Sequence, residues 1–79
     1  MRISREVEFV GRSIRIIVNG MGEDVPESAT LASLIELFKE ADPALIVEHN
    51  GRFVYPKEYA TTTVAESDRV EFIHPDFGG

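Results

Sequence analysis

The 79-residue sequence predicts one α+β domain, in which a mixed sheet of four to five strands is covered on one face by a single main helix. Short stretches rich in β-branched and aromatic residues, separated by turn residues, occur along most of the chain. One central stretch has the apolar spacing of a helix instead. Because strands precede and follow this helix, we expect the first and last strands to lie side by side and parallel.

The first firm strand is expected over residues 13–18, which are rich in β-branched side chains. Alternate apolar residues from Ile14 to Val18 would share one face of the sheet. Asn19-Gly20 follows and suits the positive φ angles of a tight hairpin turn. The return strand, within residues 21–27, contains a glycine and a proline, so we expect it at an edge of the sheet.

The helix is expected to begin after Thr30, which is a good N-cap residue. Ser33 stands where a capping box has glutamate, so we expect only half of that motif. Asp42-Pro43 should end the helix, because the residue before a proline is disfavoured in the α region. The apolar residues at helix spacing are Leu31, Leu34, Ile35 and Phe38.

Three further strands are expected after the helix. Residues 45–49 and 52–55 flank a second Asn-Gly turn, and residues 69–73 alternate apolar and charged side chains. One short helical turn is expected at residues 56–59, before the last strand. The order strand, strand, helix, strand, strand, strand is that of a β-grasp domain, which we place at residues 14–74.

Outside this domain we expect an N-terminal extension and a flexible C-terminal tail. The extension, residues 1–13, could add one more strand. The tail, residues 75–79, ends in Gly78-Gly79. Glycine has no side chain to pack and loses much backbone entropy on ordering, so two glycines favour a thin, mobile end that can enter a narrow slot. Alone, this motif is weak evidence.

Composition excludes several functions. The sequence has no cysteine and only two histidines, which excludes a structural zinc site and a cysteine nucleophile. The formal net charge of −6 argues against nucleic-acid binding, which depends on Lys and Arg contacts to phosphates. No apolar run is long enough for a membrane span, and no signal peptide is recognised, so we expect a cytoplasmic protein without a membrane partner.

The sequence resembles the ubiquitin-like sulfur carriers ThiS and MoaD over residues 14–79. Residues 50–59, Asn-Gly-Arg-Phe-Val-Tyr-Pro-Lys-Glu-Tyr, are similar to a ThiS segment, and Asp68 to Phe72 is similar to the final strand of the family. Gly78-Gly79 is similar to the functional end of these carriers. Three features depart from the family pattern. The first thirteen residues have no counterpart in a minimal ThiS, Ser67 replaces the usual glycine before Asp68, and residues 75–77 replace the small or aliphatic residues often found before the glycines.

The resemblance implies that Gly79 is the reacting residue of a sulfur carrier. An adenylating partner of the ThiF or MoeB kind would use ATP to activate the Gly79 carboxylate, and a sulfur donor would convert it to a thiocarboxylate. A thiazole synthase-like acceptor of thiamine biosynthesis would then take the sulfur. The carrier itself would be no enzyme and bind no cofactor. Gly78, Phe77, Asp76 and Pro75 would form the tail that enters the partners.

Other functions remain open at this point. A MoaD-like carrier would donate sulfur to a molybdopterin synthase-like acceptor. A ubiquitin-like modifier would be joined through Gly79 to lysines of target proteins. A plain β-grasp binding module would have an idle tail.

Three residues are candidates for docking a partner. Phe53 and Tyr55 could form an exposed apolar patch, since aromatic residues often anchor interfaces. His74 lies beside the tail and could contact a partner or the adenylate, although an ordinary exposed histidine is the simpler interpretation. For Phe72, we favour a position in the core. We predict no metal site.

Overall fold

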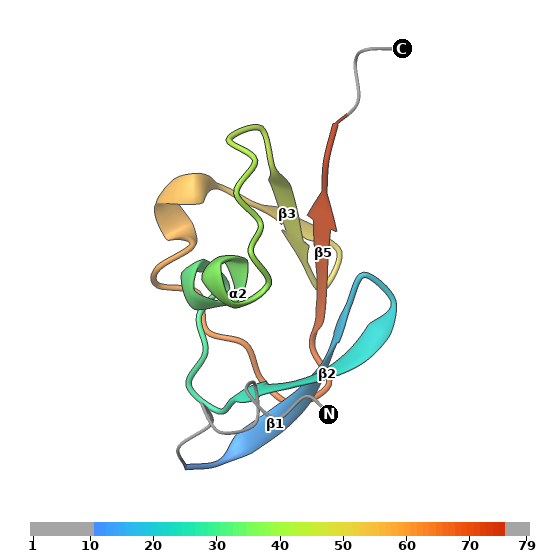
Figure 1. Cartoon of the computed structure of the whole chain (residues 1–79), viewed down its shortest axis with the longest axis vertical. Coiled ribbons are helices and arrows are strands. Elements are labelled where there is room, and N and C mark those ends of the chain that lie inside the picture. The colour runs from blue at the N-terminus through green and yellow to red at the C-terminus, as the bar shows by residue number, and fades with distance from the viewer. Residues whose placement is uncertain (1–10, 76–79) are drawn as a thin grey trace.

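The computed structural model describes residues 11–75, in which a five-stranded mixed sheet carries one α-helix on one face (Figure 1). This arrangement confirms the predicted α+β class and β-grasp topology. The elements in chain order are β1 (Ser13–Val18), β2 (Met21–Pro26), α2 (Leu31–Leu37), β3 (Ile46–His49), β4 (Arg52–Val54), the 3-10 helix η1 (Pro56–Glu58) and β5 (Arg69–Ile73).

Strand β5 occupies the middle of the sheet, whose strand order is β2-β1-β5-β3-β4. It pairs in parallel with β1, where Ile17 lies opposite Arg69, and antiparallel with β3 on its other side. The parallel pairing of the first and last strands is therefore confirmed, as is the edge position of β2. Strand β5 joins the β1–β2 hairpin to the β3–β4 hairpin.

Both Asn-Gly pairs form the expected tight turns. Asn19 and Asn50 have φ angles of 51° and 52°, and the glycine after each also has a positive φ. Each asparagine has a second role, because its side-chain oxygen accepts a hydrogen bond from the backbone of β5. Asn19 Oδ1 accepts from the N–H of Phe72, and Asn50 Oδ1 accepts from the N–H of Arg69, both at 2.8 Å. The two turns thus stabilise the position of the central strand.

Helix α2 begins after Thr30, as expected, but its capping box is complete. Thr30 Oγ1 accepts a hydrogen bond from the backbone N–H of Ser33 at 3.1 Å, and Ser33 Oγ accepts one from the N–H of Thr30 at 2.9 Å. The prediction of half a box was wrong, because a serine hydroxyl at this position reaches the N-cap backbone as a glutamate would.

The helix ends at Leu37, several residues before Asp42-Pro43, so the predicted end was also wrong. Lys39 adopts φ 58°, and its N–H donates to the carbonyl of Glu36 at 3.1 Å. The N–H of Glu40 donates to the carbonyl of Ile35 at 2.9 Å. These two bonds form a Schellman motif, which usually has glycine at the left-handed position. Because Lys39 stands where glycine is usual, the sequence gives no signal that the helix ends here.

The hydrophobic core lies between the sheet and α2. Phe72 is only 5% exposed, and its ring centroid lies 6.3 Å from that of Phe38, so its predicted core position is confirmed. Every strand contributes to the core. The fully buried large side chains are Ile16, Val25, Leu31, Leu34, Val47 and Val70.

Some predictions fall on residues that the structure does not describe. Most of the N-terminal extension, residues 1–10, lies outside the described residues, and so do Asp76, Phe77, Gly78 and Gly79 of the tail. The bounds of the domain and the extra strand stay predictions. Among residues 11–75, no helix is long and apolar enough to cross a membrane.

Candidate functional site

The candidate site lies at the carboxyl end of β5, where the central strand leads toward the tail. Figure 1 shows this end of β5 pointing away from β1 and β2. Val54 of β4 and Phe72 of β5 both pair with Val47 of β3. Strands β4 and β5 therefore run in the same direction. Tyr55, the first residue after β4, lies level with Ile73, the last residue of β5, and β3 lies between them. The sheet thus places Tyr55 and His74 toward the same end of the domain, whereas Phe53 lies opposite Glu48 and level with the middle of β5.

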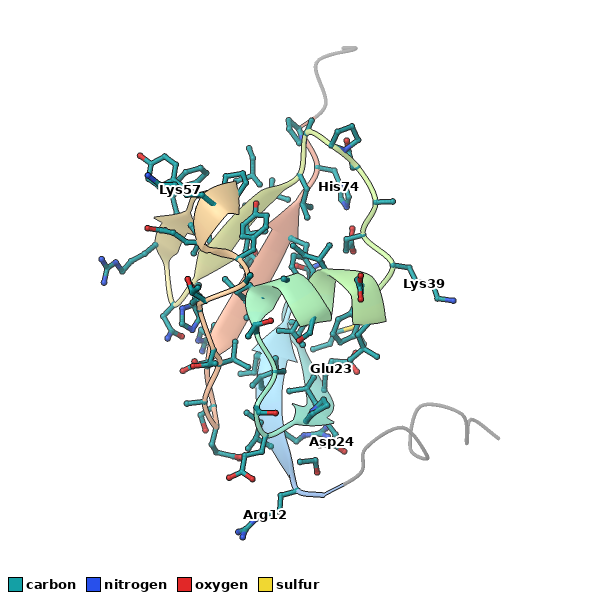
Figure 2. All side chains as sticks on the ribbon, turned by 90° about the vertical axis from the view of Figure 1, so that its left-hand side faces the viewer. Arg12, Glu23, Asp24, Lys39, Lys57 and His74 are labelled. Atoms are coloured by element: carbon teal, nitrogen blue, oxygen red, sulfur yellow. The ribbon has the colours of Figure 1, made fainter. Side chains whose placement is uncertain are left out.

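His74, the first residue after β5, contacts two carboxylates from the segment that follows α2. Its Nε2 lies 2.7 Å from Oε1 of Glu40, and its Nδ1 lies 3.2 Å from Oδ2 of Asp42. The His74 side chain is 48% exposed and that of Glu40 is 19% exposed. Figure 2 shows His74 at the end of the molecule opposite Arg12. We call these contacts the His74 ion pairs.

The pKa values of both His74 and Asp42 are shifted from their ordinary values. Hydrogen bonds to Asp42 and then to Glu40 raise the pKa of His74 above its ordinary value of 6.5. The backbone N–H of Ala44, which donates to Asp42 Oδ1 at 2.8 Å, is the main cause that lowers the pKa of Asp42, and His74 adds to it. The two shifts agree in sign, since both favour the charged forms of His74 and Asp42.

Phe53 and Tyr55 form an exposed aromatic pair beside β4. They are 50% and 57% exposed, and their ring centroids lie 4.7 Å apart in an edge-to-face arrangement. An open hollow of about 200 Å³ adjoins Phe53 and is lined also by His49, Arg52, Val54, Glu58 and Thr62. Its volume is below the range of about 300–1,000 Å³ that is usual for cofactor and drug-sized ligand pockets. Aromatic residues of this kind are more often part of a core, but both members of this pair are exposed, and their docking role stays a prediction.

The second histidine belongs to a structural network at the other end of β5. His49 Nε2 lies 2.8 Å from Asp68 Oδ2, which also accepts a hydrogen bond from the backbone N–H of Ala65 at 2.8 Å. Asn50 Nδ2 donates to Asp68 Oδ1 at 3.1 Å. The network ties the β3–β4 turn to the residues before β5. Among residues 11–75, no group of three or more His, Cys, Asp or Glu side chains could hold a metal ion.

Sequence reasoning found His74 by its place beside the tail but missed both of its partners. The sequence pattern indicates for Asp42 only that it precedes a proline, and it indicates no role for Glu40. The two acids lie more than thirty residues from His74 along the chain, and the loop that carries them has its shape because the helix ends early. No local sequence signal indicates this contact.

Comparisons with known proteins agree with the fold. The model of the ThiS family matches residues 7–79. This match begins seven residues closer to the N-terminus than the resemblance seen in the sequence, which covers residues 14–79. A crystal structure of the thiamine biosynthesis protein ThiS from Geobacter metallireducens superposes with a TM-score of 0.75 at 32% sequence identity. This alignment covers 84% of the present chain and 100% of the Geobacter chain. A search of curated proteins finds no match.

Proposed function

This chain belongs to the ThiS family, and we propose that it is a sulfur carrier of thiamine biosynthesis that reacts through the carboxylate of Gly79. The observation that carries the proposal is the family match, which extends through Gly78-Gly79. The fold supports it, because the central strand of the sheet leads directly to the tail.

The proposed chemistry begins with activation of the Gly79 carboxylate. A carboxylate is a poor electrophile, because its negative charge repels nucleophiles and oxide is a poor leaving group. A ThiF- or MoeB-like partner would let a carboxylate oxygen attack the α-phosphate of ATP, which forms an acyl-adenylate and releases pyrophosphate. A donor that delivers sulfur at the oxidation level of hydrosulfide would then form a carbon–sulfur bond as the carbon–oxygen bond to AMP breaks and the S–H proton is released. The product is a thiocarboxylate at Gly79.

The thiocarboxylate would serve as a tethered sulfur nucleophile. The sulfur would attack an electrophilic carbon of the substrate held by a thiazole synthase-like acceptor. The acyl carbon–sulfur bond would then break as an oxygen from water or from that substrate takes its place, which returns Gly79 to its carboxylate form. In this scheme both reactions occur in the active sites of partners, so the chain acts as a carrier and not as an enzyme. It needs no bound cofactor, and ATP is a substrate of the activating partner. A cytoplasmic location stays a prediction.

The intact mass of the protein tests this proposal directly. The full chain is incubated with ATP, a sulfur donor and a ThiF-like enzyme from the same cell. We expect one oxygen to be replaced by sulfur, and fragmentation should locate the change at Gly79. An unchanged mass with every ThiF- or MoeB-like enzyme of the cell, under conditions in which each enzyme is active, would contradict the proposal. Isopeptide-linked conjugates would indicate a protein modifier instead.

A variant of the tail tests whether thinness matters. We expect Gly78→Val to accept sulfur much more slowly than the natural chain, because a branched side chain blocks entry into a narrow slot. Ala65→Val is the control, since it places the same branched side chain at an exposed position before β5. A Gly78→Val variant that is modified at the full rate would show that the tail does not enter a narrow site.

A further inference from the structure

Both ring nitrogens of His74 lie within contact distance of a carboxylate. A neutral imidazole carries a hydrogen on only one nitrogen, and an ionised carboxylate can only accept hydrogen bonds. The two His74 ion pairs are therefore satisfied together only when the ring is protonated on both nitrogens. The geometry itself selects the imidazolium form, in which His74 bridges Glu40 and Asp42.

The two carboxylates are held by the fold. The backbone N–H of Glu40 completes the Schellman motif at the end of α2, and the Glu40 side chain is largely buried. The carboxylate of Asp42 accepts the backbone N–H of Ala44. His74 directly follows Ile73, which pairs with Ile46 of β3. The imidazolium thus connects the end of the central strand to a fixed part of the helical layer.

We propose that His74 is a positioning residue, whose contacts with Glu40 and Asp42 hold the base of the tail and set the direction in which it leaves the domain. This inference rests on the proposed carrier function. It assigns His74 a role within the chain, whereas its position in the sequence favoured an ordinary exposed histidine, with a partner contact as the alternative. Pro75 follows at once and has a fixed φ, which extends the held segment by one residue.

Holding the base of the tail should matter when the tail enters a partner. Association costs free energy for every flexible group that must be ordered, and a group ordered beforehand reduces this cost. We therefore expect the His74 ion pairs to favour binding of the carrier. They should leave the chemical step unchanged, because His74 would contact neither ATP nor the reacting carboxylate.

The positioning should depend on pH in a definite direction. Among the described residues, the charged groups that act on His74 are Glu40 and Asp42, and both are acidic. The pKa of His74 is raised, so its contribution is fully present below its ordinary pKa of 6.5 and is lost as pH rises through the raised value. The pKa of Asp42 is lowered, so its contribution is lost only in acid, below 3.8. The contacts are therefore strongest in mildly acidic solution and weaken toward alkaline pH.

The first test compares His74→Gln with the natural chain as substrates of the ThiF-like enzyme. Glutamine retains a hydrogen-bond donor but cannot carry the charge. At about pH 6 we expect KM of the variant to be roughly two- to tenfold higher with kcat unchanged, and this KM ratio should approach one at about pH 8.5. Because both substrates meet the same enzyme at each pH, the pH dependence of the enzyme cancels in the ratio. His49→Gln, which removes a histidine–carboxylate pair far from the tail, should give a KM ratio that does not vary with pH.

A second readout needs no partner. We expect ¹⁵N NMR of the natural chain at about pH 6 to show His74 protonated on both nitrogens. In Asp42→Asn and Glu40→Gln variants, which lose charge but keep their shape, the pKa of His74 should fall toward 6.5. A His74 pKa that is the same in all three proteins would overturn the inference.

The outcomes separate this inference from the proposed function. If the natural chain is modified but the KM ratio of His74→Gln stays near one at every pH, His74 does not position the tail and the carrier function stands. A raised KM ratio that is constant with pH would also refute the inference, because it would indicate a direct contact with the partner. If the natural chain is never modified, the proposed function fails, and with it the inference, whatever the NMR titration shows.

Discussion

Replacing Ser67 by glycine should stabilise the domain. Ser67 adopts φ 72° in the turn before β5, a conformation in which a side chain is strained. Its backbone N–H donates to the carbonyl of Arg15 at 2.8 Å, and glycine would keep this bond. The Ser67 side chain is exposed, so little packing is lost.

The magnitude follows from two opposing effects. A left-handed conformation costs a non-glycine residue roughly 1–2 kcal/mol, and Ser67→Gly removes this cost. Glycine also gives the unfolded chain more freedom, which lowers the free energy of unfolding by about 0.4–1 kcal/mol. We therefore expect a net gain of about 0.5–1 kcal/mol, which in a domain of this size raises Tm by about 2–8 °C.

Urea denaturation followed by circular dichroism measures this change, with Ser28→Gly as the matched control. Ser28 is also an exposed turn residue but is not among the positive-φ residues, so its replacement brings only the entropic loss. The two variants should differ in free energy of unfolding by roughly 1–2 kcal/mol, with equal m-values. Equal destabilisation of both variants would refute the reasoning, because it would mean that Ser67 bears no conformational cost.

Three further predictions concern stability. Leu34→Ala should lower the free energy of unfolding by about 2–5 kcal/mol in urea denaturation, because Leu34 is fully buried between α2 and the sheet. Lys39→Gly should raise it by about 0.5–1 kcal/mol in the same assay, since φ 58° favours glycine; a loss would contradict the assigned helix end. Burial acts to raise the pKa of Asp68, but hydrogen bonds from His49 and from the N–H of Ala65 lower this pKa overall. The contribution of Asp68 to the free energy of unfolding is therefore present above its ordinary pKa of 3.8 and is lost in acid. In urea midpoints measured against pH, Asp68→Asn should therefore lose part of the acid-side slope, and an unchanged slope would count against this network.

The sequence predicts the fold well wherever a local pattern determines the structure. The Asn-Gly pairs fix two hairpins because asparagine and glycine accept positive φ angles. Thr30 marks the helix start for a similarly local reason, since its side chain binds the first turn. The parallel pairing of β1 and β5 follows from the order of the elements and a general rule of connection.

The helix end and the surroundings of His74 could not be predicted, and the two failures have one origin. Lys39 adopts the conformation that usually indicates glycine, so the sequence pattern suggests a longer helix. The early end places Glu40 and Asp42 in a loop that reaches the end of β5. A longer helix would have used the same residues in its last turn. The contact of His74 with these acids depends on tertiary structure and on the left-handed conformation of Lys39, and the spacing of apolar residues predicts neither.

The central place of β5 has a consequence for folding kinetics. The two hairpins consist of neighbours in the sequence and can form early, but in the strand order only β5 joins them. An isolated hairpin is marginally stable at best, and the pairing of β1 with β5 must close a loop of about fifty residues. Folding should therefore await the synthesis and docking of β5, and destabilising changes in Val70 or Phe72 should slow folding more than changes in the outer strands. Because the tail follows β5, a partner meets the proposed reacting end only on chains that already contain the strand needed to complete the sheet.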